Sequence, residues 1–331
     1  MANVLVTGGA GYVGSVCCAE LLSLGNSVTV VDDLSTGFRD SVPRGAVFFP
    51  IDIGNRTEMQ KLLQSRMFDV VFHFAAKALV AESVANPGVF FRTNIESGIA
   101  MLEALREAGI KNFVFSSSAA VYGTPERIPI DEDDPKKPVN PYGESKLIFE
   151  QILQWYAKSY CWSIFSFRYF NAAGASADLG ERHSPETHII PLLLQAAAGE
   201  REFFSICGGD YKTPDGTCLR DYVHVVDIAH AHICALQKIN QPGMRTYNIG
   251  SGTSHSVRQV CEAVGKVVGH SVPVRVVGRR PGDPAVLHAN PQRIIRELMW
   301  NPKHSSLEEI ISSAWQWKRN HFTTHTPASH R

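Results

Sequence analysis

A tyrosine and a lysine lie four residues apart in the stretch NPYGESK, residues 140–146. Asn140 is a residue type that caps helices and Pro141 suits the first helical position, so we predict that a helix begins here. That helix places Tyr142 and Lys146 one turn apart on one face, where an ammonium group lowers a tyrosine pKa. The lowering matters because a tyrosine of pKa about 10 is about a thousandth ionised at neutral pH, and its use as a base costs ~4 kcal/mol. The same spacing also occurs on exposed helices without a catalytic role, so other motifs decide between the two interpretations.

A serine-rich stretch, SSSAAVYG at 116–123, supplies another polar group at the end of a predicted strand. The Ser118 hydroxyl is a candidate for holding a substrate oxygen while Tyr142 moves the substrate proton.

A glycine-rich turn follows the first predicted strand. In VLVTGGAGYVGS, Gly8, Gly11 and Gly14 fit G-x-x-G-x-x-G, and Gly9 with the latter two fits G-x-G-x-x-G. A turn of this kind between a strand and a helix lets the backbone approach a pyrophosphate, and the helix N-terminus favours its negative charge. About 20 residues later, Asp32 ends the second predicted strand, where an acid bonds a ribose 2′-hydroxyl. The pattern therefore predicts a dinucleotide site.

Adjacent carboxylates indicate which dinucleotide binds. Asp33 stands beside Asp32, and the pair repels a 2′-phosphate, so NAD is favoured over NADP. The ends of the third and fourth predicted strands are expected to line the cofactor's path. The residues expected there are Asp52, Ile53, Phe74, Ala75, Ala76 and Lys77.

Short β-branched runs alternate with helical patterns through the first half of the chain. This alternation predicts a parallel sheet with helices on both faces, an α/β fold of the doubly wound, Rossmann type. Strands are predicted at 3–8, 27–33, 46–52, 69–76, 112–118 and 163–170, and helices at 13–25, 56–66, 95–109 and 145–160.

The pattern changes after about residue 170. A polar, Gly/Pro-containing segment over 171–188 precedes an apolar helix at 189–200, and later pieces include strands near 246–251 and 272–277 and a helix at 306–320. We expect an NAD-binding Rossmann domain over 1–170 and a smaller mixed α/β substrate domain over 171–331, with some later segments returning to the first domain.

Charge and composition limit the classes of partner. The chain has 32 basic and 32 acidic residues and no basic run, which gives no reason to expect nucleic acid or a membrane surface. The N-terminal stretch lacks the pattern of a secretory signal, and no segment reaches ~20 apolar residues. The seven cysteines show no CxxC spacing and fit reduced thiols, so we expect a cytoplasmic protein without a metal site.

The glycine turn, Asp32, SSSAAVYG and YGESK, in this order, resemble the extended short-chain dehydrogenase/reductase family. RYFNAAGA, THIIP, GGDYKTPDGTCLRDYVHV and RRPGD narrow the resemblance to the UDP-glucose 4-epimerases within it, over nearly the whole chain. The resemblance implies interconversion of UDP-galactose and UDP-glucose through a transient 4-keto sugar with bound NAD. It implies that Tyr142 takes the proton of the sugar 4-hydroxyl, that Lys146 lowers the tyrosine pKa and holds the nicotinamide ribose, and that Ser118 bonds the 4-oxygen.

The resemblance also implies contacts from the rest of the chain. For the cofactor they are Tyr12, Val13, Thr93, Asn94, Ser116 and Phe170. For the UDP-sugar they are Asn171, His188, Ile189, Ser205, Ile206, Cys207, Arg220, Tyr222, Arg280, Asp283 and Leu287. The arginines are candidate diphosphate clamps because a guanidinium offers paired donors to phosphate oxygens. A homodimer formed through helices near 90–109 and 144–158 is implied as well.

Four positions depart from the family pattern. Well-known members carry an aromatic residue at Cys207, and asparagines at His188 and Thr93, although Asn94 follows the last of these. Some members close the sugar pocket with a tyrosine at the position of Leu287. A leucine is shorter than tyrosine but bulkier than the small residues of dual-specificity members, so we predict little activity on UDP-N-acetylglucosamine.

Three other functions share parts of this pattern. A nucleotide-sugar 4,6-dehydratase usually places an Asp-Glu pair directly after the strand-end hydroxyl, whereas this chain has Ala119 and Ala120. A UDP-pentose 4-epimerase acting on UDP-xylose and UDP-arabinose stays open, because the sugar C6 group is read by pocket shape. An NAD-sensing regulatory protein needs no catalytic tyrosine, whereas Ser118, Tyr142 and Lys146 are all present.

Overall fold

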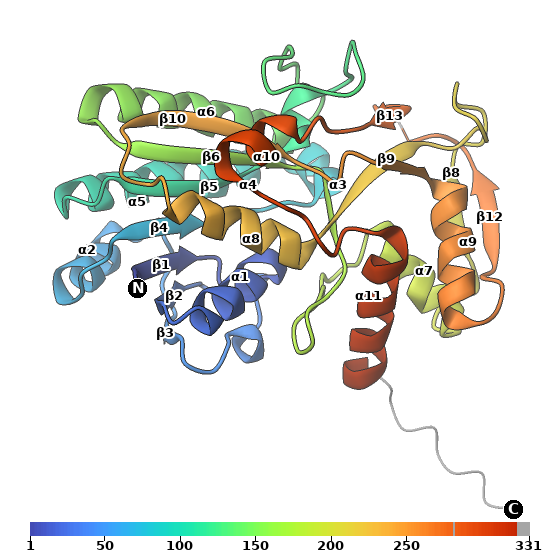
Figure 1. Ribbon diagram of the computed structural model, residues 1–331, viewed down its shortest axis with the longest axis horizontal. Coiled ribbons are helices and arrows are strands. Elements are labelled where there is room, and N and C mark those ends of the chain that lie inside the picture. Colours follow the sequence, from blue (N-terminus) through green and yellow to red (C-terminus); the bar gives the residue numbers. More distant parts are fainter. Residues whose placement is uncertain (281, 323–331) are drawn as a thin grey trace, which may run out of the picture.

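The computed structural model describes residues 1–280 and 282–322 of the chain. Within them, a seven-stranded parallel sheet has the order β3-β2-β1-β4-β5-β6-β10 and occupies the left half of Figure 1. This order confirms the predicted doubly wound α/β fold. The strands are β1 (Asn3–Thr7), β2 (Ser27–Val31), β3 (Val47–Phe49), β4 (Val70–His73), β5 (Asn112–Ser118), β6 (Ser163–Tyr169) and β10 (Gly243–Ile249).

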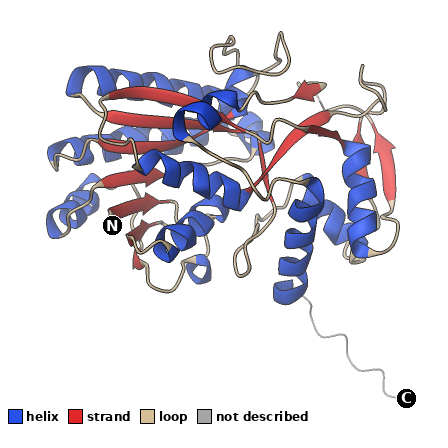
Figure 2. Ribbon diagram, in the orientation of Figure 1, coloured by secondary structure: helices blue, strands red, loops and turns tan. Residues whose placement is uncertain are grey.

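Helices cover both faces of this sheet (Figure 2). Strand β1 shows why: Val4 and Val6 enter one apolar cluster and Leu5 enters the other, because successive side chains of a strand point to opposite faces. The first cluster includes residues of α1 (Tyr12–Ser23), α8 (Val225–Leu236) and α10 (Gln292–Leu298). The second includes residues of α2 (Arg56–Ser65), α5 (Ser97–Glu107) and α6 (Pro141–Tyr160). None of the described helices is long and apolar enough to cross a membrane.

A smaller unit lies beyond one end of the sheet, at the right of Figure 1. Its central strand, β9, pairs with three others, and β8 pairs with β12. Side chains from its helices and strands form a separate apolar cluster. The elements are β7 (Asn171–Ala173), α7 (Ile189–Ala197), β8 (Phe204–Cys207), β9 (Leu219–His224), β11 (Ser254–Ser256), α9 (Val257–Val268), β12 (Val274–Val277), β13 (Val286–Leu287) and α11 (Leu307–Phe322).

The chain crosses between the two units more than once. Strand β10, expected from the pattern at 246–251, joins the large sheet beside β6, and α8 packs against that sheet with α1. Residues beyond 170 thus complete the Rossmann unit. Five short helical segments connect the larger elements: η1 (Arg39–Ser41), α3 (Val80–Ala85), α4 (Pro87–Phe91), η2 (Arg92–Glu96) and η3 (Ala119–Tyr122).

Candidate active site

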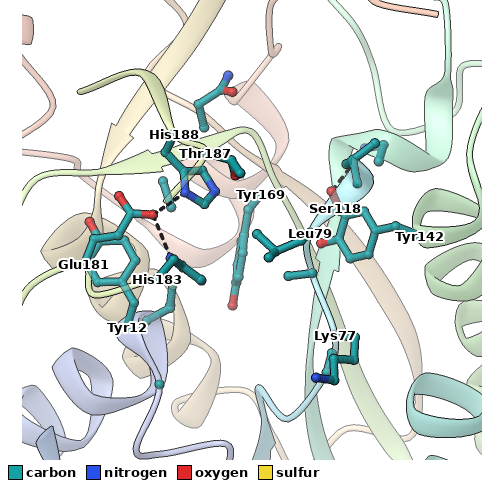
Figure 3. Close-up of a pocket in the computed structure, with 18 of the residues that line it drawn as sticks. Tyr12, Lys77, Leu79, Ser118, Tyr142, Tyr169, Glu181, His183, Thr187 and His188 are labelled. Atoms are coloured by element: carbon teal, nitrogen blue, oxygen red, sulfur yellow. Dashed lines mark hydrogen bonds and ion pairs between the residues drawn. The ribbon is translucent and has the colours of Figure 1, made fainter. Parts of the chain in front are cut away.

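Helix α6 begins as the sequence predicts. The Asn140 side chain accepts a hydrogen bond from the Gly143 backbone N–H at 2.8 Å, and Pro141 occupies the first helical position. A Cβ at Gly143 would lie 2.5 Å from the Ala120 carbonyl oxygen, so the absence of a side chain lets α6 start against the turn that follows β5. This contact brings Tyr142 and Ser118 to the same wall of one cavity (Figure 3).

The electrostatic environment of Tyr142 opposes its ionisation. Burial raises the pKa of this tyrosine above its ordinary value, and interaction with the Ser118 side chain lowers it in part. The Lys146 ammonium nitrogen is 6.0 Å from the centre of the tyrosine ring and donates to the Ser116 carbonyl at 2.8 Å. The pKa of Tyr142 is therefore shifted in the direction opposite to the one expected from Lys146 alone.

Lys146 is itself deeply buried. Burial lowers the pKa of Lys146 from 10.5 to about 7, and the carboxylate of Glu150, one turn further along α6, opposes this shift. Glu150 accepts hydrogen bonds from Ser117 at 2.6 Å and from the Arg168 guanidinium at 2.6 and 3.0 Å. This buried pair ties α6 to β5 and β6, and so fixes the height of Lys146 above the sheet.

The glycine turn has the shape that a pyrophosphate requires. A Cβ at Gly8 would lie 2.4 Å from the Ala75 nitrogen, and one at Gly14 would lie 2.3 Å from the Gly8 oxygen, so only glycine fits at either position. Gly11 caps α1 and lines the cavity, and its nearest neighbour, the Gly8 oxygen, is 3.4 Å from the Cβ position. This opening, together with the free N–H groups of the first helical turn, fits the predicted dinucleotide.

Asp32 is held in place at the end of β2. Its carboxylate accepts backbone N–H groups of Ala10 at 3.0 Å and Leu34 at 2.9 Å. Burial raises the pKa of Asp32, and these two donors lower it. The carboxylate therefore has fixed oxygens at the cavity wall, as a ribose hydroxyl would require.

The cavity measures about 730 Å³ and extends from the glycine turn into the smaller unit. Of the predicted cofactor residues it is lined by Gly8, Gly11, Tyr12, Val13, Gly14, Asp32, Asp33, Asp52, Ile53, Phe74, Ala75, Ala76, Lys77, Thr93, Ser116, Tyr142, Lys146 and Phe170. Of the predicted substrate residues it is lined by Ser118, Asn171, His188, Ile189, Ser205, Cys207, Arg220, Tyr222, Arg280, Asp283 and Leu287.

Two predicted site residues do not line the cavity. Ile206 points into the apolar cluster of the smaller unit, because strand alternation turns Ser205 and Cys207 to the cavity and Ile206 away from it. Asn94 is buried behind the wall, where its side chain bonds the backbone N–H and C=O of Lys77 at 2.8 and 3.0 Å. Asn94 therefore supports the Lys77 loop from behind.

Arg220 and Asp283, both predicted substrate residues, form an ion pair with each other across the cavity wall. Arg220 also donates to the Leu219 carbonyl at 2.8 Å, and Arg280 is exposed at the rim. The two predicted diphosphate clamps thus differ: one is held by a carboxylate, and the other is open to solvent.

Several lining residues were not expected from the sequence. Tyr169 stands near the centre of the cavity, and Glu181, His183 and Thr187 lie on the wall opposite Tyr142, beside the predicted residue Tyr12 (Figure 3). The signal for the last group was present in the segment ERHSPETH, which holds four ionisable side chains besides its arginine.

The arrangement of the glycine turn, Asp32 and the Tyr142–Lys146 pair agrees with a known sequence family. A sequence profile of the NAD dependent epimerase/dehydratase family matches residues 4–250. The chain belongs to this family. The match covers the seven-stranded sheet, including β10, and the part of the smaller unit that contains β8 and β9.

Similar members of the family share a name. A UDP-glucose 4-epimerase of Streptomyces lividans is 47% identical over 320 residues, which is 96% of each chain. A crystal structure of UDP-glucose 4-epimerase from Brucella ovis in complex with NAD matches with a TM-score of 0.92 and 41% identity, over 95% of this chain and 98% of that one. The UDP-glucose 4-epimerase of Bifidobacterium longum in complex with NAD+ and UDP matches with a TM-score of 0.92 and 35% identity, over 96% and 98% of the two chains.

Proposed function

We propose that the protein is an NAD-dependent isomerase that interconverts UDP-galactose and UDP-glucose by transient oxidation at C4. The observation that carries the proposal is the convergence of Tyr142, Ser118 and Lys146 on one cavity that also includes the glycine turn and the smaller unit. The name shared by relatives with up to 47% identity supports it, as does the NAD in both of the solved structures described above.

Residues of the Rossmann unit would hold NAD. The first turn of α1 would receive the pyrophosphate, and Asp32 the adenine ribose. When bound, NAD supplies the acceptor and donor of hydride at the sugar carbon. Holding that group is the task of the Rossmann unit, in which Gly11 leaves the necessary space.

The chain's own residues handle the proton. Tyr142 takes the proton of the sugar 4-hydroxyl and returns it, and the Ser118 hydroxyl holds the same oxygen in reach. Lys146, when charged, favours the tyrosinate. The 4-keto sugar must present both faces in turn, so the UDP group has to be anchored at a distance by the smaller unit, through Arg220 and Arg280.

The family also includes dehydratases, which the site argues against. The residues directly after Ser118 are Ala119 and Ala120, and both line the cavity in the turn η3. Neither supplies the acid or base that expulsion of a 6-hydroxyl requires. A UDP-pentose 4-epimerase uses the same proton chemistry, and only the sugar pocket distinguishes it.

A direct assay tests the function. Purified protein is mixed with UDP-galactose without added NAD, and UDP-glucose is measured; we expect conversion to the equilibrium mixture from either side. A parallel panel with UDP-xylose, UDP-arabinose and the UDP-N-acetylhexosamines shows whether the enzyme acts on hexoses or pentoses and whether it accepts N-acetylated sugars. A 4-keto-6-deoxy sugar as the product, or no conversion of any UDP-sugar, would contradict the proposal.

We also propose a cytoplasmic homodimer joined through α4, α5 and α6. Large apolar side chains are exposed on these helices: Val89 at 37%, Ile99 at 38% and Trp155 at 64%. A second copy of the chain would cover these side chains.

The state of the cysteines supports the cytoplasmic location. All seven lie in the described part of the chain and none of them forms a disulfide, which fits a reducing compartment.

A further inference from the structure

Three side chains of one short segment, Glu181, His183 and His188, lie on the cavity wall that faces Tyr142 (Figure 3), and Glu186 of the same segment contacts His188. Glu181, His183, Glu186 and His188 each offer one ligand atom, and all four atoms lie within 4.8 Å of one another. They belong to the loop between β7 and α7, which has no regular secondary structure over these eight residues. We propose that Glu181, His183, Glu186 and His188 bind one Zn²⁺ ion, which fixes this wall of the cavity.

The contacts within this cluster carry the proposal. His188 Nδ1 lies 2.7 Å from Glu181 Oε1 and 2.8 Å from Glu186 Oε1, and His183 Nδ1 lies 3.0 Å from the same Glu181 oxygen. A ring nitrogen carries at most one hydrogen, so His188 Nδ1 cannot donate fully to both carboxylates. A cation accepts electron pairs from all of these atoms at once, and therefore satisfies the cluster better than a single proton.

The charge of the cluster points the same way. The side chains of Glu181 and Glu186 are only 7% and 9% exposed, and among the described residues both carboxylates form their ion pairs with the two histidines. Arg182, in the same segment, pairs with Asp40 instead. Two enclosed carboxylates that lack a lysine or arginine partner in this part of the chain favour a divalent cation.

Small side-chain movements would bring the four ligand atoms to the corners of a zinc tetrahedron. Zinc takes imidazole nitrogen and carboxylate oxygen at about 2.0–2.2 Å in a tetrahedron, whose corners are then about 3.4 Å apart. The pairs that lie 2.7, 2.8 and 3.0 Å apart would separate by a few tenths of an ångström, and atoms up to 4.8 Å apart would approach by as much as about 1.4 Å. Mixed nitrogen and oxygen ligands argue against Mg²⁺ and Ca²⁺, which prefer oxygen alone.

The surroundings already hold part of the cluster in place. Glu186 Oε1 accepts the backbone N–H groups of Thr187 at 2.7 Å and His188 at 2.8 Å. At the start of the segment, a Cβ at Gly180 would lie 2.4 Å from the Trp317 ring, so the loop is pressed against α11. Four protein ligands fill the zinc shell, so the ion is structural, and the substrate contact expected of His188 falls to its backbone.

The test uses the full chain and Zn²⁺ alone. Protein freed of metal by a chelator is titrated with Zn²⁺ in competition with a zinc-sensitive dye, and bound zinc is counted by mass spectrometry. We expect about one zinc per chain and a higher melting temperature on zinc addition. His183→Gln and Glu181→Gln should each weaken zinc binding at least about 100-fold and abolish the rise in melting temperature.

A second histidine cluster provides the control. His224 and His304 have ring centres 5.6 Å apart, and His304 pairs with Glu309 on the surface. His304→Gln should leave zinc binding unchanged. The proposal would be overturned if the wild-type protein bound no zinc or if both cluster variants kept their zinc. An equal loss of zinc binding in His304→Gln would also overturn it. Thermal melts in the presence of the chelator show whether each variant is folded. A variant that does not fold is replaced by Glu186→Gln.

Discussion

In the proposed reaction Tyr142 would need neighbouring positive charge to act as a base, and the surrounding protein supplies only part of that charge. A full charge on Lys146, 6.0 Å from the ring centre, contributes on the order of 3 kcal/mol at an effective dielectric constant of about 20, or about two pKa units. Burial acts in the opposite direction on the tyrosine pKa, and it also lowers the pKa of Lys146 to about 7. The positive ring of oxidised NAD is thus a necessary second charge in this account.

Replacing Lys146 by methionine should change how stability depends on pH. The pKa of this lysine is about 7 in the folded protein and 10.5 in the ordinary state. Between these two pH values the unfolded chain binds more protons than the folded protein, so this group makes the free energy of unfolding rise with pH. Below about pH 7 the cost of burying the charged lysine is fully present. The free energies of unfolding of wild type and Lys146→Met are measured in urea at pH 7, 8 and 9. Their difference should shift in favour of wild type as the pH rises. A constant difference would contradict the buried, partly neutral lysine.

Leu287 should restrict the size of the sugar. It lines the cavity from β13 and is half-buried against the cluster that contains Phe170. We expect kcat/KM for UDP-N-acetylglucosamine to be at least about tenfold below that for UDP-glucose. Leu287→Ser should reduce this difference between the two substrates. Val286→Ala, next to it and outside the cavity lining, is the control. Equal turnover of both sugars by wild type would show that Leu287 does not restrict the pocket.

Helix α6 sets the position of the tyrosine through its first turn, so its cap should affect both stability and activity. Asn140→Ala removes the acceptor for the Gly143 N–H and should cost about 1 kcal/mol of unfolding free energy. Asn55→Ala is a matched change, because Asn55 caps α2 by accepting the Glu58 N–H at 3.2 Å. Both variants should lose similar stability in urea, but only Asn140→Ala should lower kcat. An equal effect on kcat would remove the link between this cap and catalysis.

Local patterns predicted these elements well, and long-range packing explains the differences. The cap at Asn140 and the strands of the Rossmann unit follow from residue type and period, although β2 and β4 end two or three residues before the predicted ends. The sequence pattern did not show that Ile206 points away from the cavity or that Asn94 stands behind it. Strand alternation sets Ile206 opposite to Ser205 and Cys207, but packing within the smaller unit decides which side of β8 meets the cavity. The direction of the Asn94 side chain depends on its contact with Lys77. The cluster around Glu181 was missed for a different reason, since its ligands are histidines and glutamates, whereas the expectation of no metal site rested on cysteine spacing.

The two units share one cavity, so neither would form the site alone. Strand β10 returns from the second half of the sequence to the large sheet, and the segment after β7 crosses to the wall opposite Tyr142. The residues predicted to bind the cofactor lie mainly in the first unit, and those predicted to bind the substrate lie mainly in the second. Chemistry at the sugar carbon therefore requires both units to be held together.

Helices α4, α5 and α6 expose large apolar side chains and should form the contact between two copies of the chain. Trp155→Glu places a charge at the most exposed of these side chains and should convert a dimer into a monomer without unfolding it. Light scattering after size exclusion measures the mass. Met67→Glu, at a residue that is 88% exposed and lies beyond the end of α2, should leave the mass unchanged. Wild-type protein that elutes as a monomer at micromolar concentration would refute the dimer.

The central claim is that the Tyr142 oxygen moves the proton of a UDP-sugar held in a cavity that both units build. Its most direct test compares wild type and Tyr142→Phe for conversion of UDP-galactose to UDP-glucose without added NAD, while the NAD released on denaturation is measured for each. We predict that kcat falls by at least about 10³-fold and that NAD content is unchanged. Turnover by Tyr142→Phe within about tenfold of wild type, at equal NAD content, would contradict the claim.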